Sequence, residues 1–138
     1  MSLHCLIYTS IASQKMTDED LKAILEKARP RHVALDITGM LLYQDPFFMQ
    51  IFEGEEHIIH RQFARIAKDP RHHKVSLIYN KPIDERNFTK WTMGFNKIST
   101  QHIEYAESLN TLYDSGSFTN QSKFVLKLLE MFKNETLF

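Results

Sequence analysis

Gln50 is the residue that most needs a chemical explanation, because it stands inside the apolar stretch FFMQIFEGE at residues 47–55. In a strand, side chains alternate between faces, so Gln50 shares a face with Phe48 and Phe52. A buried amide without partners costs about 1–3 kcal/mol. A carboxamide donates hydrogen bonds through its nitrogen and accepts them through its oxygen. Taken alone, Gln50 is most often a core amide with satisfied hydrogen bonds; the functional alternative is a hydrogen-bonding switch.

The other reactive side chains do not combine into a recognisable catalytic or metal site. His57 and His60 have a usable ligand spacing on a helix, but no cysteine or carboxylate cluster converges on them, so no metal is predicted. Cys5 lies in an apolar strand without cationic neighbours, which indicates a small core residue and not a reactive thiol. The acidic residues nearest these segments are interpreted as surface or helix-start charges: Asp45, Glu53, Glu55 and Glu56.

The composition is that of an ordinary globular domain of 138 residues, with 25% charged and 43% apolar residues. Lys plus Arg equals Asp plus Glu at 17 each, so a broad basic field for nucleic acid is not expected. A single cysteine excludes a disulfide framework. The sequence shows no apolar run of membrane-spanning length and no leader before the first strand, so we expect no membrane association and a reducing, cytoplasmic location.

Hydrophobic periodicity predicts the elements that position these residues. Thr17 with Asp20 forms a capping box at the start of the first helix, Pro30 ends that helix at about Arg29, and Pro70 ends the second helix. In chain order the predicted elements are strand 3–10, helix 17–28, strands 36–43 and 47–54, helix 55–69, strands 75–80 and 91–99, and helices at 101–109 and 120–134.

This order predicts an α+β fold with a ferredoxin-like β-α-β-β-α-β core, a fifth strand, and two helices on one sheet face. Both faces of the strands are apolar, so the C-terminal helices are expected to cover the second face. We therefore divide the chain into a core at 1–98 and a helical output or oligomerisation segment at 99–138. Apolar residues at 124–132 favour a homo-oligomer, the alternative being a stripe that packs wholly within the chain.

Several short motifs occur together in a specific order. They are Tyr8 on the first strand, ITG and LLY on the second, Gln50 with EGE on the third, DPRHH after the second helix, and RNFTKWTM before the fifth strand. This set, over about residues 1–98, resembles the BLUF family of blue-light sensors that use flavin. The resemblance implies a non-covalent flavin between the two helices, with FAD expected and FMN as the alternative.

The resemblance also implies a mechanism. Tyr8 and Gln50 lie next to the flavin ring, and light drives electron and proton transfer from Tyr8 via Gln50, after which the pair recombines with Gln50 rearranged. No net turnover results, so the protein is expected to be a photoreceptor and not an enzyme. Trp91 and Met93 on the fifth strand relay the change to the C-terminal helices and a downstream partner protein, which the sequence does not identify. The alternative for these two side chains is that they only fill the core.

Cofactor-binding residues follow from the same resemblance. Ile24 and Ile66 match the positions that sandwich the ring, and Arg65 matches a basic residue on the cofactor side. Asp69, Arg71 and His72 occupy the motif near the phosphate end.

One position departs from the family pattern. His32 stands where an asparagine is usual, and the resemblance implies that this position binds the pyrimidine edge of the flavin. A histidine can donate one hydrogen bond to a carbonyl there, but it cannot make the paired donor and acceptor contact of an amide. Arg31 next to it supplies further donors. An alternative is therefore a non-photoactive ligand-binding or oligomerising regulatory module on the same fold. A small enzyme is a third hypothesis, but the sequence offers no acid–base or nucleophile pair for it.

Overall fold

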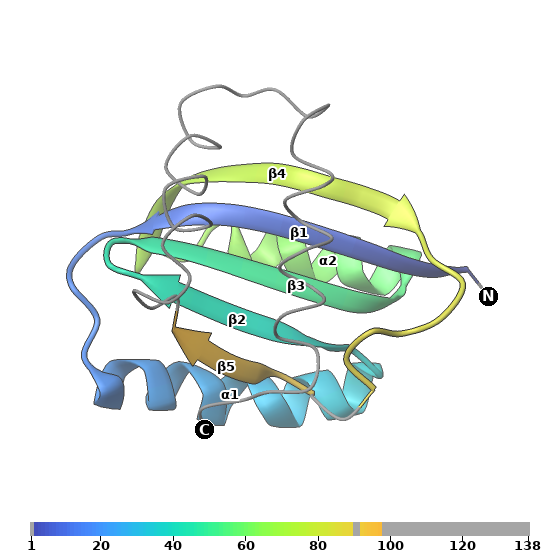
Figure 1. Ribbon diagram of the computed structural model, residues 1–138, viewed down its shortest axis with the longest axis horizontal. Helices are drawn as coiled ribbons and strands as arrows, with labels where there is room; N and C mark the ends of the chain where they lie inside the picture. The colour runs from blue at the N-terminus through green and yellow to red at the C-terminus, as the bar shows by residue number, and fades with distance from the viewer. Residues whose placement is uncertain (1, 90–91, 98–138) are drawn as a thin grey trace.

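The computed structural model describes residues 2–89 and 92–97. Five strands form one mixed sheet in the order β4-β1-β3-β2-β5, with two helices packed against it (Figure 1). Neighbouring strands are antiparallel except β2 and β5, which are parallel. The predicted ferredoxin-like α+β fold is confirmed. The elements are β1 Leu3–Ala12, α1 Asp18–Leu35, β2 Thr38–Gln44, β3 Phe47–Glu55, α2 Glu56–Ile66, β4 His72–Pro82 and β5 Gly94–Lys97.

Both helices pack on the same face of the sheet. Leu21 and Leu25 of α1 and Ile59 of α2 join one apolar cluster with Leu6 and Phe52 of the central strands. The opposite face of these strands is also fully buried, with exposures of 1% or less at Cys5, Ile7, Leu42, Met49 and Ile51. The predicted helices at 101–109 and 120–134, and with them the segment 99–138 and its apolar stripe, lie outside the described residues.

The start of α1 is as predicted. Thr17 is the N-cap, its hydroxyl oxygen accepts from the Asp20 amide at 3.1 Å, and the Asp20 carboxylate accepts from the Thr17 amide at 2.9 Å. These reciprocal bonds satisfy two backbone donors that a helix start would leave without partners.

The predicted end of α1 is wrong, because the helix continues past Pro30 to Leu35. Pro30 has no amide hydrogen for the carbonyl of Glu26, but both residues are exposed, so water can bond that carbonyl. The helix ends instead at Asp36, whose φ of 53° is in the left-handed region and whose amide donates to the carbonyls of His32 and Val33.

Other boundaries shift for local reasons. β4 extends beyond the predicted 75–80, because it is an edge strand whose side chains are mostly exposed or half-buried and therefore show little alternation. α2 ends at Ile66, before Pro70, and the amides of Lys68 and Asp69 bond three residues back in a tightened last turn. β5 is shorter than the predicted 91–99 and occupies Gly94–Lys97.

The glycine of the ITG motif has a steric role. A Cβ on Gly39 would lie 1.8 Å from the carbonyl oxygen of Ile51, so any side chain there would push β2 away from β3. The close pairing of β2 with the strand that carries Gln50 therefore requires glycine at this position.

Glu53 was predicted to be a surface charge, and this is wrong. Its carboxylate is fully buried. It accepts four hydrogen bonds: from the Phe88 amide at 2.8 Å, the Thr38 hydroxyl at 3.3 Å, and the Asn87 amide and side chain at 2.7 and 3.1 Å. Glu53 thereby fixes the segment that leads toward β5. Three of these four bonds come from Asn87 and Phe88, more than thirty residues further along the chain, which is why periodicity could not reveal the role.

Glu55 and Glu56 do lie at the helix start, as predicted. The Glu55 side chain caps α2 by accepting from the Ile58 amide at 3.1 Å, and Glu56 opens its first turn. In the part of the chain that the structure describes, no helix is both long enough and apolar enough to cross a membrane.

Candidate functional site

A cavity of about 480 Å³ opens between the two helices and the sheet face that they cover. This volume lies within the range of small-molecule sites. Its lining combines apolar side chains, a buried polar pair and several cations: Tyr8, Ile24, Lys27, Ala28, Arg31, Leu41, Phe48, Gln50, Gln62, Arg65, Ile66, Lys68, Asp69, Pro70, Arg71 and His72.

Tyr8 and Gln50 form a hydrogen-bonded pair in the wall of this cavity. They are direct partners in the antiparallel register of β1 and β3, so both side chains leave the sheet on the cavity side. The Tyr8 hydroxyl donates to Gln50 Oε1. Both residues are nearly inaccessible, at 3% and 6% exposure. The Tyr8 ring also lies 5.4 Å from that of Phe63, so the polar pair has apolar surroundings in which its hydrogen bond is strengthened.

The second contact of Gln50 is weak. Its Nε2 donates to the sulfur of Met93 at 3.6 Å, and a thioether is a poor acceptor. The backbone at this point is held from α1: Arg29 Nε donates to the Met93 carbonyl at 2.9 Å and His32 Nδ1 to the Thr92 carbonyl at 2.7 Å. The amide therefore contacts a flexible side chain on a fixed backbone. Trp91, the other predicted relay residue, lies outside the described residues.

Apolar walls face each other from the two helices. Ile24 on α1 and Ile66 on α2 both line the cavity, as do Leu41 and Phe48 from the sheet. This arrangement offers apolar contact to two sides of a flat ring while the polar pair meets its edge.

Cations surround the polar part of the cavity. Arg65 and Arg71, which the resemblance places at the cofactor, line it together with Arg31, and Lys27 and Lys68 add two more that the sequence reasoning missed. Lys27 lies three residues after Ile24 on α1, so helical spacing could have identified it, whereas Lys68 lies in the turn after α2. Their combined field favours an anionic ligand.

Asp69 is the only acid among the lining residues, and it is paired. Its carboxylate accepts from Arg71 Nε at 3.0 Å and from Nη2 at 2.5 Å. These bonds lower the pKa of Asp69 and raise that of Arg71. Asp69 therefore orients the Arg71 guanidinium and leaves the cavity with a surplus of positive charge.

His72 lines the cavity, but both of its ring nitrogens are occupied. Nε2 lies 2.7 Å from the Ile66 carbonyl and Nδ1 lies 2.7 Å from the Ser10 hydroxyl. Because a carbonyl only accepts, Nε2 carries the proton and Nδ1 accepts from Ser10 in the neutral ring. The ring also meets Tyr8 edge-on at 6.0 Å. His72 thus joins the end of α2 to β1 beside Tyr8.

His32 is not among the lining residues of the cavity. It is fully buried, and its ring meets that of Phe52 edge-on at 5.7 Å. Burial lowers the pKa of His32, and Arg31 lowers it further, against the opposing effect of the Thr92 hydrogen bond. Since Nδ1–H donates to Thr92, Nε2 is a bare acceptor without a partner among the described residues. The expectation that His32 donates to a ligand carbonyl therefore does not fit this arrangement.

Gln62 is a further buried amide that the sequence reasoning missed. It is 5% exposed and lines the cavity from α2. The same signal that singled out Gln50 applies to it, because Gln62 lies on the inner side of its helix between Ile59 and Ile66.

Comparison with known proteins gives consistent results. The family model described as sensors of blue-light using FAD matches residues 3–94. The beta subunit of a photoactivated adenylate cyclase from Euglena longa is 38% identical over 93 residues, which is 67% of this chain and 11% of the cyclase subunit. The blue light- and temperature-regulated antirepressor BluF of Escherichia coli K12 is 25% identical over 135 residues, or 98% of this chain and 33% of BluF. The chain thus spans only a small part of these curated relatives.

Solved structures agree. The photo-activated state of BlsA superposes with a TM-score of 0.82 and 28% identity, covering 99% of both chains. The dark-state structure of BlrB, a BLUF protein, superposes with a TM-score of 0.78 and 28% identity, covering 96% of both chains. Together with the matched family model, these similarities establish that the chain belongs to the BLUF family, the sensors of blue light that use FAD.

Proposed function

We propose that this protein is a blue-light photoreceptor that binds FAD non-covalently in the cavity between α1 and α2, with FMN as the alternative, and that it performs no net turnover. The observation that supports this most directly is the buried hydrogen bond from Tyr8 to Gln50 in the cavity wall. Family membership establishes a flavin-using light sensor; the roles of individual residues are the proposal.

The residues of the cavity fit a flavin. Ile24 and Ile66 provide apolar contact from two helices, and the amide of Gln50 provides the donor and acceptor that the edge of the ring needs. The cations Arg65 and Arg71 would hold the phosphates, with Asp69 orienting Arg71.

When bound, the flavin supplies a strong oxidant on excitation by blue light. Tyr8 can lose an electron together with a proton, and its hydrogen bond to Gln50 Oε1 is the path for that proton. The electron and the proton would then return to Tyr8 together, so that no net redox change remains, and Gln50 would be left turned over or in its imidic tautomer. In either form the amide presents reversed hydrogen-bond polarity to the cavity without backbone movement.

The same rearrangement acts on Met93. In the described arrangement Gln50 Nε2 donates to the Met93 sulfur. A rotated amide turns its oxygen toward that sulfur, and two acceptors form no hydrogen bond. Met93 is then released to repack, which an unbranched thioether does easily. Met93 immediately precedes β5, so the released side chain is a route to β5 and the residues after it, with Trp91 as the proposed second relay residue.

We infer that output is protein contact, made through the residues after β5, with homo-oligomerisation and an unidentified downstream signalling protein in a cytoplasmic setting. The relative named as an antirepressor supports regulation through a partner, because the match covers 98% of this chain, though only 33% of the relative.

The test is a light-minus-dark absorption spectrum. Purified protein should be yellow, and blue light should shift its flavin absorption to the red. Tyr8→Phe should abolish the shift, because the donor of the electron and proton is gone. Tyr43→Phe is the matched control: Tyr43 is also buried, but its hydroxyl contacts Met16 and Asp45 and it does not line the cavity. A full red shift in Tyr8→Phe would refute the assigned donor.

A second candidate is a ligand-binding or oligomerising module without photochemistry. The position of His32, away from the cavity lining and without a donor to offer, favours it. Colourless protein that cannot be loaded with FAD would support this candidate over the first.

A further inference from the structure

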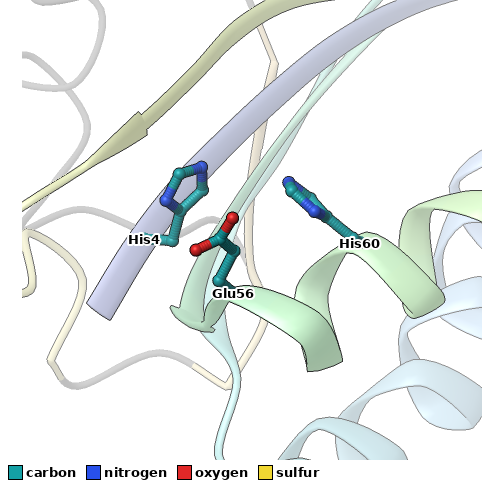
Figure 2. Close-up of side chains that lie close together, drawn as sticks. All are labelled: His4, Glu56 and His60. Carbon is teal, nitrogen blue, oxygen red and sulfur yellow. The ribbon is translucent and has the colours of Figure 1, made fainter. Parts of the chain in front are cut away.

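A second cluster of chemically active side chains lies away from the flavin cavity. His4 of β1 and Glu56 and His60 of α2 point toward one another (Figure 2). One imidazole nitrogen from each histidine and one carboxylate oxygen all lie within 4.8 Å of one another. Glu56 and His60 are one helical turn apart and so share a face of α2. None of the three lines the cavity.

Asn80 of β4 adds a fourth polar atom. Its Oδ1 lies 2.9 Å from His60 Nε2 and is also hydrogen-bonded to His4 Nε2. Because this oxygen only accepts, both Nε2 atoms donate to it in the described state. Two imidazoles from different elements therefore aim the same nitrogen at one point, with a carboxylate beside them.

Hydrogen bonding alone is an incomplete explanation of this cluster. His4 is 6% exposed, and its Nδ1 has no hydrogen-bond partner among the described residues. Its ring lies 5.3 Å from that of His60 and meets it edge-on. A buried nitrogen without a partner costs free energy, so this cluster is not a fully satisfied hydrogen-bond network.

We propose that His4, Glu56 and His60 form a binding site for a divalent first-row transition metal ion, with Zn²⁺ as the test ion. Two imidazole nitrogens and one carboxylate are a ligand set that such ions take, whereas Ca²⁺ and Mg²⁺ prefer oxygen ligands throughout. The fourth position falls to Asn80 Oδ1 or to water. On binding, each Nε2 gives up its proton, to Nδ1 of the same ring or to solvent, and its lone pair goes to the metal.

The required movement is small. Ligand atoms about 2.0–2.1 Å from a tetrahedral ion lie ~3.3 Å apart, so the present separations must close by roughly 1.5 Å at most. Glu56 and His60 are partly exposed and can rotate, while buried His4 fixes one ligand. Metal would then clamp β1, the first turn of α2 and, through Asn80, β4.

From the sequence, His57 and His60 are the histidines at ligand spacing, and no metal is predicted because no cysteine or carboxylate cluster converges on them. His57 is exposed on the neighbouring face of α2 and does not belong to the cluster. The true partner of His60 is His4, which lies on another element and far away in the sequence. Helix periodicity alone could not bring them together.

The test is a calorimetric titration of the full chain with Zn²⁺ after treatment with chelator. We expect one saturable site, and a loss of affinity of about tenfold or more in His60→Gln and in Glu56→Gln. The matched control His57→Gln should bind as the wild type does. Circular dichroism of each variant reports folding, and Zn²⁺ should raise the melting temperature of the wild type and of His57→Gln but not of His60→Gln.

Two results would overturn the proposal. One is that the wild type binds Zn²⁺ no more tightly than His60→Gln does. This includes the case in which the wild type shows no saturable binding up to about 1 mM Zn²⁺. The other is a loss in His57→Gln as large as in His60→Gln, which would indicate diffuse binding to surface histidines. Neither result bears on the flavin site, because the two sites share no residue.

Discussion

Gln50 and Glu53 are two buried polar residues on the same strand that are held in opposite ways. Among the described residues, Gln50 has one good hydrogen bond, from Tyr8, and one weak contact to the Met93 sulfur. Glu53 accepts four hydrogen bonds, three of them from the segment at 87–88. By strand alternation they lie on opposite faces of β3. The Gln50 amide can therefore satisfy its hydrogen bonds in more than one orientation, whereas the Glu53 carboxylate can do so in a single orientation.

The difference shows how one strand can carry a switch and an anchor. A carboxylate surrounded by donors loses several bonds in any other orientation, so it stays in place. An amide beside a phenol can be inverted at small cost, because a phenol both donates and accepts. Glu53 thereby fixes the segment that leads toward Met93, while Gln50 can change its contact to the Met93 side chain.

Substitution of Glu53 should change stability more than any other substitution considered below. Glu53→Gln replaces one accepting oxygen with an NH₂ group that faces donors, so the free energy of unfolding should fall by about 2–4 kcal/mol. At temperatures below the lowered melting temperature, where the variant is folded, the light-induced red shift should still be observed. Denaturant unfolding and difference spectra measure these two quantities. Glu19→Gln, at an exposed position in the first turn of α1, is the control and should change stability by less than about 0.5 kcal/mol.

If Glu53→Gln instead abolished the red shift at temperatures where the variant is fully folded, the division between switch and anchor would be wrong.

A smaller effect is expected at the relay. Met93→Leu removes the N–H···S contact but keeps an apolar side chain of similar volume. Weak hydrogen bonds contribute about 0.5–1 kcal/mol, so the rate of dark recovery should change by a factor of about two to five, with the red shift retained. The recovery time after a blue-light pulse measures this. Met49→Leu, on the opposite face of β3, should leave recovery unchanged; equal effects in both variants would remove Met93 from the relay.

The smallest effect concerns His32, whose two nitrogens are unequally satisfied. Its pKa is lowered in the folded protein, mainly by burial, from an ordinary value of 6.5. Below that pH the unfolded chain binds protons that the folded chain excludes, so stability should fall as pH falls. The loss of unfolding free energy from about pH 7.5 to 5.5 should therefore be smaller in His32→Asn than in the wild type. Exposed His57→Asn should keep the wild-type slope, and an unchanged slope in His32→Asn would contradict the assignment.

The fold could largely be predicted from the sequence, because strand alternation, the Thr17 capping box and the apolar faces are local signals. The end of α1 could not, since Pro30 ordinarily stops a helix, and here Arg29 and His32 on either side of it bond the backbone of residues 92 and 93. The role of Glu53 was missed for the same reason: its partners come from a distant segment. Tertiary contacts decided both cases.

The site shows the same limit. The positions of Tyr8, Gln50 and the cavity walls follow from strand register and helix faces, and the family resemblance implied their roles at the flavin. The occupied nitrogens of His72 and the displacement of His32 from the lining depend on side-chain hydrogen bonds that no spacing encodes. The cluster of His4 with His60 likewise required the strand and the helix to be brought together.

The decisive measurement on Gln50 is infrared difference spectroscopy, light minus dark, on protein with isotope-labelled glutamine side chains. We expect a label-sensitive pair of amide carbonyl bands in the wild type, lost in Gln50→Leu, and no band that depends on the Glu53 carboxylate. Illuminated wild-type protein that shows a red-shifted flavin but no label-sensitive glutamine band would contradict this expectation.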